Sequence, residues 1–167
     1  MKMRIRFDRL SPDDEAEFIA ASRRSRALHR PWVAPASTPA AFRAYVARMS
    51  GPGQHAFAVR RRDDGTLVGV VTISNVVMGP FRNAYIGYYV FAPHARRGYL
   101  REALQAIVRD AFRAMKLHRL EANIQPGNRA SIALARTCGF RKEGFSPRYL
   151  KIGGRWRDHE RWAILAR

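Results

Sequence analysis

The sequence predicts a single α/β domain, and three observations support that prediction. Residues 100–115 place apolar side chains at the spacing of one face of a 3.6-residue helix. Residues 67–77 and 85–91 are rich in β-branched or aromatic side chains and are separated by a turn sequence, which is typical of neighbouring strands. The chain of 167 residues is long enough to enclose one hydrophobic core. The full series of predicted elements reads β-α-α-β-β-β-α-β-α-β-β, which is a mixed α/β order.

The chain starts with a predicted strand and a predicted helix. Residues 3–10 alternate in polarity, as a strand with one buried face does. Ser11 and Pro12 are typical of a helix start, and the acidic residues that follow suit its positive end. We expect this helix to run to about Leu28. The side chains expected to face the core are Phe18, Ala21, Ser22, Ser25 and Leu28.

A second helix and a three-stranded meander are predicted next. Arg30-Pro31-Trp32 breaks the first helix, and Thr38 caps another that runs to about Met49. Asp63-Asp64-Gly65 is a hairpin turn between strands 56–61 and 67–77. With strand 85–91, these segments should form an antiparallel meander.

Four elements are predicted after residue 91. The helix over 100–115 leads to a strand at 119–124, which we expect beside strand 85–91. A further helix should begin at Asn128 and stop at Gly139, a residue type that takes the left-handed cap readily. Two final strands, 140–152 and 155–165, are joined by Gly153-Gly154.

The net charge of +18 suits binding to polyanions such as CoA or ribosomal RNA. The alternative is compositional bias, because 27 of the 31 basic residues are arginine, a preference that can follow from a GC-rich genome. The basic residues are spread along the sequence rather than clustered with aromatic ones, and no RNA-binding motif is recognisable. Both interpretations stay open.

Other features favour a cytoplasmic protein without a membrane partner. The single cysteine, Cys138, excludes an internal disulfide and suits a reducing compartment. It lies near the end of a helix that should pack against the core, so we interpret it as a core residue rather than a nucleophile. No stretch of about 18 apolar residues occurs, and the first ten residues lack the apolar centre of a signal peptide.

A basic loop precedes the helix over 100–115 and contains Arg96, Arg97 and Gly98. The first turn of a helix has unpaired N–H groups and a partial positive charge, so these residues favour a phosphate-bearing ligand. The loop is neither a Walker A motif nor a dinucleotide fingerprint. The alternative is an ordinary strand-to-helix turn with solvated arginines.

The segment after this helix adds a more specific pattern. It contains N-x-x-S-x-x-L-x-x-x-x-G-F over residues 128–140. With the phrases IGY, GYLREAL, NRAS and CGFRKEG in this order, the chain resembles the GCN5-related N-acetyltransferase (GNAT) superfamily, and within it the RimJ/RimL type, which acetylates protein N-termini. The resemblance covers nearly the whole chain. It implies a mixed, mostly antiparallel sheet with a splayed central strand pair and about four helices.

The resemblance also implies acetyl-CoA as co-substrate and no metal. The diphosphate would be bound at the helix start by Arg96, Arg97, Gly98, Tyr99, Leu100 and Arg101. The pantetheine arm would pair with the main chain of Tyr89, Val90 and Phe91, and an N–H of that segment would stabilise the oxyanion. The loop departs from the family pattern, because Ala95 stands where Gln or Arg is usual and Leu100 where a small residue is usual. We expect Arg96 or Arg97 to compensate.

Asn128 and Ser131 are the candidates at the next helix start. By resemblance, Asn128 would bond the pantetheine and Ser131 would protonate the departing CoA thiolate. Both residues also suit simple helix capping, which remains an alternative for each.

The general base is less clearly indicated. Glu121 is a candidate if its strand turns it toward the cleft, and water is the alternative. Relatives often have a glutamate where this chain has Tyr85, which we assign with Trp32 to the acceptor cleft. Trp32 could instead plug the space beneath the helix–helix loop. The five histidines share no spacing typical of a metal site or a catalytic triad.

The sequence therefore predicts transfer of acetyl from acetyl-CoA to a primary amine in a ternary complex. The resemblance implies that the acceptor is the N-terminal α-amine of a protein, above all a ribosomal protein, and that the ribosome is a candidate partner. A homodimer stays open. The alternatives are a polyamine or aminoglycoside acetyltransferase, disfavoured by the scarcity of acidic residues, and a non-catalytic CoA-binding module.

Overall fold

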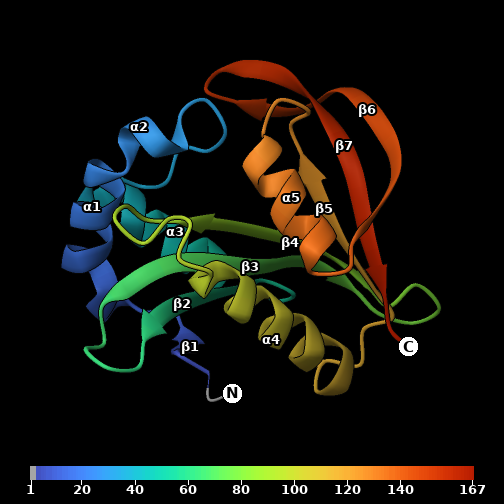
Figure 1. Cartoon of the computed structure of the whole chain (residues 1–167), viewed down its shortest axis with the longest axis horizontal. Coiled ribbons are helices and arrows are strands. Elements are labelled where there is room, and N and C mark those ends of the chain that lie inside the picture. The colour runs from blue at the N-terminus through green and yellow to red at the C-terminus, as the bar shows by residue number, and fades with distance from the viewer. Residues whose placement is uncertain (1–2) are drawn as a thin grey trace.

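Seven segments form one twisted sheet in the computed structural model, which describes residues 3–167 (Figure 1). The strands are β1 (Ile5–Arg9), β2 (His55–Arg61), β3 (Leu67–Val77), β4 (Asn83–Val90), β5 (Arg119–Ile124), β6 (Arg141–Ile152) and β7 (Arg155–Leu165). The helices are α1 (Glu15–Arg24), α2 (Arg26–His29), α3 (Pro39–Met49), α4 (Tyr99–Arg113) and α5 (Arg129–Thr137), preceded by the 3-10 turn η1 (Pro12–Asp14). The predicted α/β class and the predicted order of elements are confirmed.

The strands follow the order β1-β2-β3-β4-β5-β7-β6. All neighbouring pairs are antiparallel except β4 and β5, which are parallel. The meander β2-β3-β4 and the position of β5 beside β4 agree with the sequence prediction. Connecting parallel neighbours requires a crossover, and α4 provides it.

The central pair β4–β5 separates after a short contact. Only Asn83–Tyr85 of β4 pairs with Arg119–Glu121 of β5. Beyond these three residues, β4 continues to Val90 and β5 to Ile124 without a mutual register. The splayed pair implied by the family resemblance is therefore present, and it leaves main-chain groups free at the centre of the sheet.

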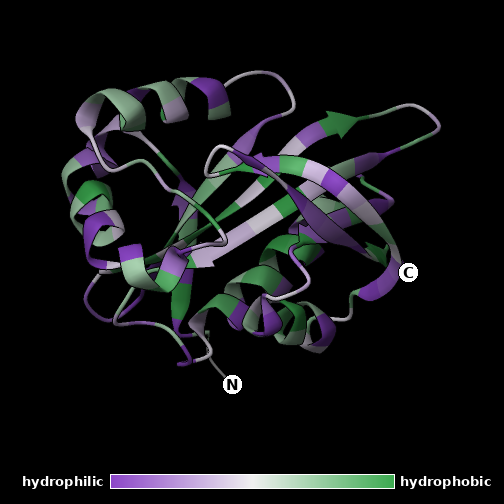
Figure 2. Ribbon diagram, turned by 90° about the horizontal axis from the view of Figure 1, so that it is seen from above, coloured by the Kyte–Doolittle hydropathy of each residue, from purple (hydrophilic) through white to green (hydrophobic). Residues whose placement is uncertain are grey.

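Each face of the sheet carries its own hydrophobic core. On one face, α4 and α5 bury Leu104, Ile107 and Ala135 against the strands. On the other, Phe18 of α1 and Phe42 of α3 pack against each other with ring centroids 4.8 Å apart. Figure 2 shows the hydrophobic colour concentrated on the central strands and on parts of the helices. The predicted apolar face of α4 is confirmed, because six of its residues from Ala103 to Ala111 are buried.

The first helix differs from its prediction. It is interrupted at Ser25, whose hydroxyl donates to the Ala21 carbonyl (2.7 Å) and accepts from the Ala92 N–H (2.9 Å). A serine that bonds the carbonyl four residues earlier bends a helix. After this break His29 is buried, whereas Leu28 is 42% exposed, so the predicted core position of Leu28 was wrong. The break gives five α-helices among the described residues, where the resemblance implied about four.

Within residues 3–167, no helix combines the length and the apolar character needed to cross a bilayer.

Candidate active site

The N-terminus of α4 presents free backbone donors beside a left-handed glycine. Gly98 has φ +80°, which an L-residue adopts only under strain. The N–H of Glu102 is the first in the helix to find a helical partner, the Gly98 carbonyl at 3.2 Å. The N–H groups of Tyr99, Leu100 and Arg101 precede that bond and are therefore the orphan donors of the helix start.

Arg4, which lies just before β1, fastens this loop to the helix. Its backbone N–H and its Nε donate to the Glu102 carboxylate (2.9 and 2.6 Å), and its Nη2 donates to the Arg97 carbonyl (3.1 Å). Glu102 thus faces a cation. The cation comes from 98 residues away in the chain, a pairing that local sequence does not reveal.

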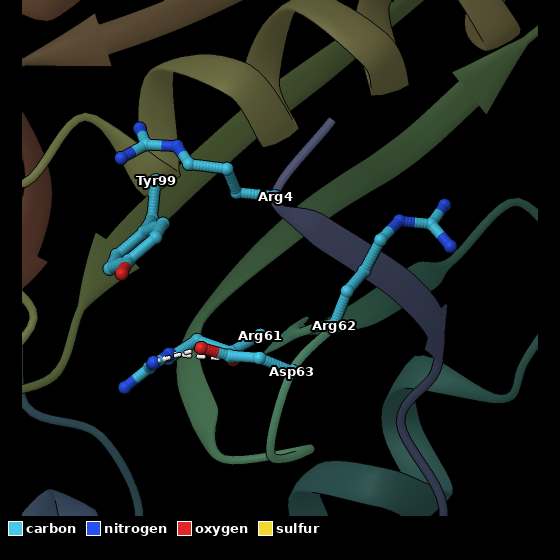
Figure 3. Close-up of a pocket in the computed structure, with 5 residues that line it drawn as sticks. All are labelled: Arg4, Arg61, Arg62, Asp63 and Tyr99. Carbon is cyan, nitrogen blue, oxygen red and sulfur yellow. Dashed lines mark hydrogen bonds and ion pairs between the residues drawn. The ribbon is translucent and has the colours of Figure 1, made fainter. Parts of the chain in front are cut away.

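Several cations surround the α4 N-terminus. The guanidinium groups of Arg4 and Arg61 lie 4.7 and 5.9 Å from the Tyr99 ring centroid, and Figure 3 shows Tyr99 between them. The pKa of His94, in the same loop, is lowered by burial first and then by the nearby charges of Arg61, Arg97 and others. Arg96 and Arg97 are exposed. Arg4, just before β1, and Arg61 of β2 thus join the two loop arginines, although Arg4 is paired with Glu102 and Arg61 with Asp63 and Asp64.

The open edge of β4 differs in part from the sequence prediction. The Phe91 N–H donates to the Val68 carbonyl (2.8 Å), so it is used within the sheet. Bonding alternates along an antiparallel pair, and Tyr89 opposes Val70 in the same register, so the main-chain groups of Tyr89 also face β3. Of the three residues predicted to pair with pantetheine, only Val90 therefore turns its main chain toward the gap between β4 and β5.

His29 occupies part of that edge. Its Nε2 lies 2.8 Å from the Val90 carbonyl oxygen, and only a protonated nitrogen can make this contact as a donor. Burial lowers the pKa of His29, while the bond to Val90 opposes this shift. The Nδ1 atom is buried and has no partner within the described residues. The Val90 carbonyl is therefore bonded to His29, and the N–H of Val90 is the group that remains directed into the gap.

The N-terminus of α5 brings together both predicted residues of the NRAS segment. The Asn128 side chain accepts from the Ser131 N–H (3.2 Å), so Asn128 caps the helix. The Ser131 hydroxyl donates to the Tyr88 hydroxyl (3.1 Å), which in turn donates to the Ser131 carbonyl (3.1 Å). Burial raises the pKa of Tyr88 to about 12, so this phenol stays protonated at neutral pH.

The opposite face of the gap carries acidic and phenolic groups. Side chains alternate along a strand, so Tyr85 lies on the face opposite Tyr88. Glu121 is its direct partner on β5 and shares that face. Arg119 Nε donates to Glu121 (2.7 Å), and Arg119 also donates to Glu143 (3.1 Å). Arg119 lowers the pKa of Glu143, and one guanidinium thus serves two carboxylates.

Tyr85 is further held from the neighbouring hairpin. Its hydroxyl lies 3.3 Å from that of Tyr149 in β6. This contact, followed by burial, raises the pKa of Tyr85 to about 12. The Tyr149 ring also meets His159 of β7 edge-on, at 6.1 Å between centroids. The cluster joins β4, β5, β6 and β7 on one face of the sheet.

Trp32 closes one end of this region. Its carbonyl accepts from Gln125 Nε2 (3.2 Å), and a Cβ placed on Gly127 would lie 3.1 Å from its ring. The ring therefore rests against the loop between β5 and α5. It connects the turn after α2 with the loop before α5.

Sequence reasoning missed His29, Tyr88, Tyr149 and the Arg119–Glu143 pair. Their partners lie 43 to 64 residues away, except that Glu143 is 24 residues from Arg119. No local spacing signals such contacts. Cys138 behaves as expected of a packed residue, because burial raises the pKa of its thiol to about 11.

The chain is similar to known acetyltransferases in sequence. Residues 4–141 match the family described as "Acetyltransferase (GNAT) domain". The chain is 41% identical over 97 residues to the [Ribosomal protein uS5]-alanine N-acetyltransferase of Escherichia coli. This match covers 58% of the chain and spans half the length of that relative.

Two solved structures share the whole fold. RimJ of Mycobacterium smegmatis, in complex with CoA-disulfide, superposes with a TM-score of 0.89 at 29% identity, covering 97% of this chain and 82% of that one. Spermidine N-acetyltransferase from Vibrio cholerae, in complex with CoA and spermine, gives a TM-score of 0.83 at 18% identity, with 98% and 95% covered, which is a likeness of fold alone. The chain belongs to the GNAT family of acyl-CoA-dependent N-acetyltransferases, and within it to the RimJ/RimL-like type.

Proposed function

We propose that this domain transfers acetyl from acetyl-CoA to the α-amine of a protein N-terminus, with a ribosomal protein as acceptor. The observation that carries the proposal is the two-sided gap between β4 and β5. Tyr88 and Ser131 lie on its α4–α5 face, and the Glu121–Arg119–Glu143 cluster lies on the opposite face. A thioester entering from one side and an amine from the other would meet there.

The cofactor would be held at two helix starts. Its diphosphate suits the orphan donors of Tyr99, Leu100 and Arg101 and the cations of the Arg96–Arg97 loop. Its pantetheine arm would run along the open edge of β4, where Val90 offers its N–H. Asn128, at the start of α5, would bond the same arm through the amide nitrogen that its capping bond leaves free.

The acceptor side carries the charge that an amine needs. Glu121 and Glu143 both accept from Arg119, and the charge of Arg161 also acts on Glu143, so two carboxylates and two guanidiniums share this face. The carboxylates, rather than a net negative charge, would attract the ammonium group of the acceptor. Tyr85 and Trp32 would flank the acceptor, as the sequence predicted.

The chemistry requires a free amine and two proton transfers. An α-amine has a pKa of about 8, so a modest base suffices. The amine attacks the acetyl carbonyl carbon, and the C–S bond breaks as the tetrahedral intermediate collapses. Glu121, directly or through water, takes the amine proton, and Ser131 protonates the thiolate. The Val90 N–H would stabilise the oxyanion.

The test is release of CoA from acetyl-CoA with a panel of acceptors. The panel holds peptides with ribosomal-protein N-termini, the same peptides with a blocked α-amine, spermidine and an aminoglycoside. We expect turnover with free peptides only. Turnover confined to the small amines would replace the proposal with a small-molecule activity. Silence with all acceptors, despite a higher Tm in acetyl-CoA, would instead favour a non-catalytic CoA-binding module.

The two carboxylates on Arg119 supply a matched pair of variants. Glu121→Gln and Glu143→Gln each remove one partner of the same guanidinium, but only Glu121 is the strand partner of Tyr85. We expect Glu121→Gln to lower kcat about 100-fold, within the range of a general base, and Glu143→Gln to lower it far less. Equal effects would show that Arg119, rather than Glu121, is the important group.

A further inference from the structure

The hairpin formed by β6 and β7 extends past the rest of the sheet. The pairing of β7 with β5 ends at Glu160, whereas its pairing with β6 continues to Arg155. The segment from Arg148 to Arg157, here called the hairpin tip, therefore has no third strand beside it. Figure 1 shows β6 and β7 curving over α5, with their connecting turn at the top of the view.

The hairpin tip is basic and lacks any acid of its own. Arg148, Lys151, Arg155 and Arg157 lie within it, and no Asp or Glu occurs from residue 144 to residue 157. None of these four takes part in an ion pair among residues 3–167. Lys142, nearer the base of the same hairpin, is paired with Glu160 at 2.6 Å. No ion pair therefore neutralises these four side chains among the described residues, and the nearest acid, Asp158, accepts from the Arg148 backbone N–H (2.8 Å).

The tip also exposes an aromatic ring beside a cation. Trp156 is 61% exposed, the largest value among the exposed large hydrophobic residues that the structure describes. It opposes Lys151 in the β6–β7 register, so both side chains lie on one face of the ribbon. Directly opposed residues have Cβ atoms about 5 Å apart. A planar group stacked on the indole would therefore lie within reach of the ammonium.

We propose that the hairpin tip is a docking surface for single-stranded or looped RNA, with a base stacked on Trp156 and phosphates bound by the neighbouring cations. Sequence-tolerant RNA binding commonly combines such a stacking ring with a positive groove. The charge of the chain, +18, complements a polyanion and repels basic proteins. One residue of the tip, Tyr149, contacts Tyr85 on the acceptor side of the gap (3.3 Å), whereas Lys151, Arg155 and Trp156 are exposed. RNA binding at these three exposed residues does not require the acceptor proposed above.

The test is fluorescence anisotropy with two labelled probes, a short single-stranded RNA of mixed sequence and its duplex. Trp156→Ala should weaken single-strand binding about tenfold, the loss of one stacked base. Lys151→Glu/Arg155→Glu should weaken it further and reduce the salt slope by about 1.4 or more, the contribution of two phosphate contacts. The duplex, whose bases are not free to stack, should be insensitive to Trp156→Ala.

The control must change the same charge elsewhere. Arg109→Glu/Arg113→Glu reverses two exposed arginines on α4, far from the tip in sequence. If this variant weakens RNA binding as much as the tip variant does, total charge is responsible and the proposal is wrong. Unchanged binding by Trp156→Ala would equally overturn it. Vesicles containing phosphatidylserine form a third probe, and tip-dependent vesicle binding without RNA binding would make the tip a membrane surface instead.

CoA release with the active acceptor shows that the tip variants are folded, because none of the three substituted residues lies in the gap. Anisotropy measures RNA binding without any acetyl transfer. It would therefore still test the RNA proposal if the acetylation proposal failed. The two proposals can therefore fail separately.

Discussion

Tyr88 and Ser131 form a reciprocal pair at the start of α5. The serine hydroxyl donates a hydrogen bond to the phenol oxygen, and the phenol donates one to the serine carbonyl, each over 3.1 Å. This arrangement fixes the serine rotamer and keeps a protonated phenol, with a pKa of about 12, directly behind it. Under the proposed mechanism, Tyr88 therefore positions Ser131 and can return a proton once the serine has given its own to the thiolate.

We predict that Ser131→Ala lowers kcat about 10- to 100-fold, at the low end for general acid catalysis because a thiolate leaves readily. Tyr88→Phe should lower kcat less, and the double variant should match Ser131→Ala, since Tyr88 acts through the serine. Steady-state kinetics measure all three, and calorimetry should show CoA affinity within about threefold of the wild type. If Tyr88→Phe has its full effect in the Ser131→Ala background, the pairing has no role in the reaction.

The lowered pKa of His29 predicts that the protein loses stability in mild acid. Burial lowers its pKa below the ordinary value of 6.5, so the native protein takes up this proton at a lower pH than the unfolded chain does. Between these two pH values the unfolded state binds more protons, and the free energy of unfolding falls as the pH falls. His55 and His94, whose pKa values are also lowered chiefly by burial, act in the same direction.

We therefore expect Tm to be highest above about pH 6.5 and to fall as the pH is lowered toward 5. His29→Gln, which keeps a donor for the Val90 carbonyl, should flatten that fall. The exposed His118, changed to Gln, is the control and should leave the profile unaltered. Calorimetric scans at several pH values measure this, and identical profiles for His29→Gln and the wild type would contradict it.

At the scale of elements, α4 was the part most readily predicted, because its apolar period is long and regular. The break at Ser25 was not predictable, since it depends on an Ala92 N–H 67 residues away. Long-range contacts also limited what could be predicted of the candidate site. The NRAS and Arg96–Gly98 segments are recognisable as local patterns, whereas the side of the β4 edge that faces the cofactor gap depends on pairing with Val68 and Val70 of β3.

The loop before α4 allows strain and ligand binding to be separated. Gly98 has φ +80° and Gly65, in the β2–β3 turn, has φ +74°, so an alanine at either position costs about 1 kcal/mol of stability. A Cβ at Gly98 would also lie 3.2 Å from Arg4 Nη2, whereas one at Gly65 meets nothing within 4 Å.

Gly98→Ala should therefore weaken acetyl-CoA binding about tenfold, equal to the loss of one hydrogen bond to a charged phosphate. Gly65→Ala should have a similar Tm but wild-type affinity. Thermal melts and isothermal titration with acetyl-CoA make the comparison. Wild-type affinity in Gly98→Ala would remove this loop from the phosphate site.

At the scale of the whole molecule, composition gives the total charge and the fold decides where that charge is neutralised. Asp14 and Glu17 both bind Arg60, at 2.5 and 2.6 Å, so acids of the N-terminal segment neutralise part of β2. At the α4 N-terminus, Glu102 neutralises Arg4, and Asp63 and Asp64 neutralise Arg61. Arg96, Arg97 and the cations of the hairpin tip have no ion pair among residues 3–167. The sequence could not separate a functional charge from a compositional one, because both give the same count of arginines.

This distribution predicts that salt acts in opposite directions on stability and on cofactor binding. In a folded protein of charge +18, the like charges repel one another. Salt screens this repulsion, because the Debye length falls from about 30 Å at about 0.01 M NaCl to about 10 Å at about 0.1 M. The Tm without ligand should therefore rise over this range. Over the same range the attraction between the α4 cations and the phosphates of CoA is screened, so the acetyl-CoA Kd should rise severalfold. S-acetylpantetheine lacks those phosphates and is the matched control, whose KM should hardly change. A similar response for both thioesters would mean that salt acts on the acyl or acceptor end of the gap. It would contradict the proposal that the cationic loop before α4 binds the phosphates of CoA.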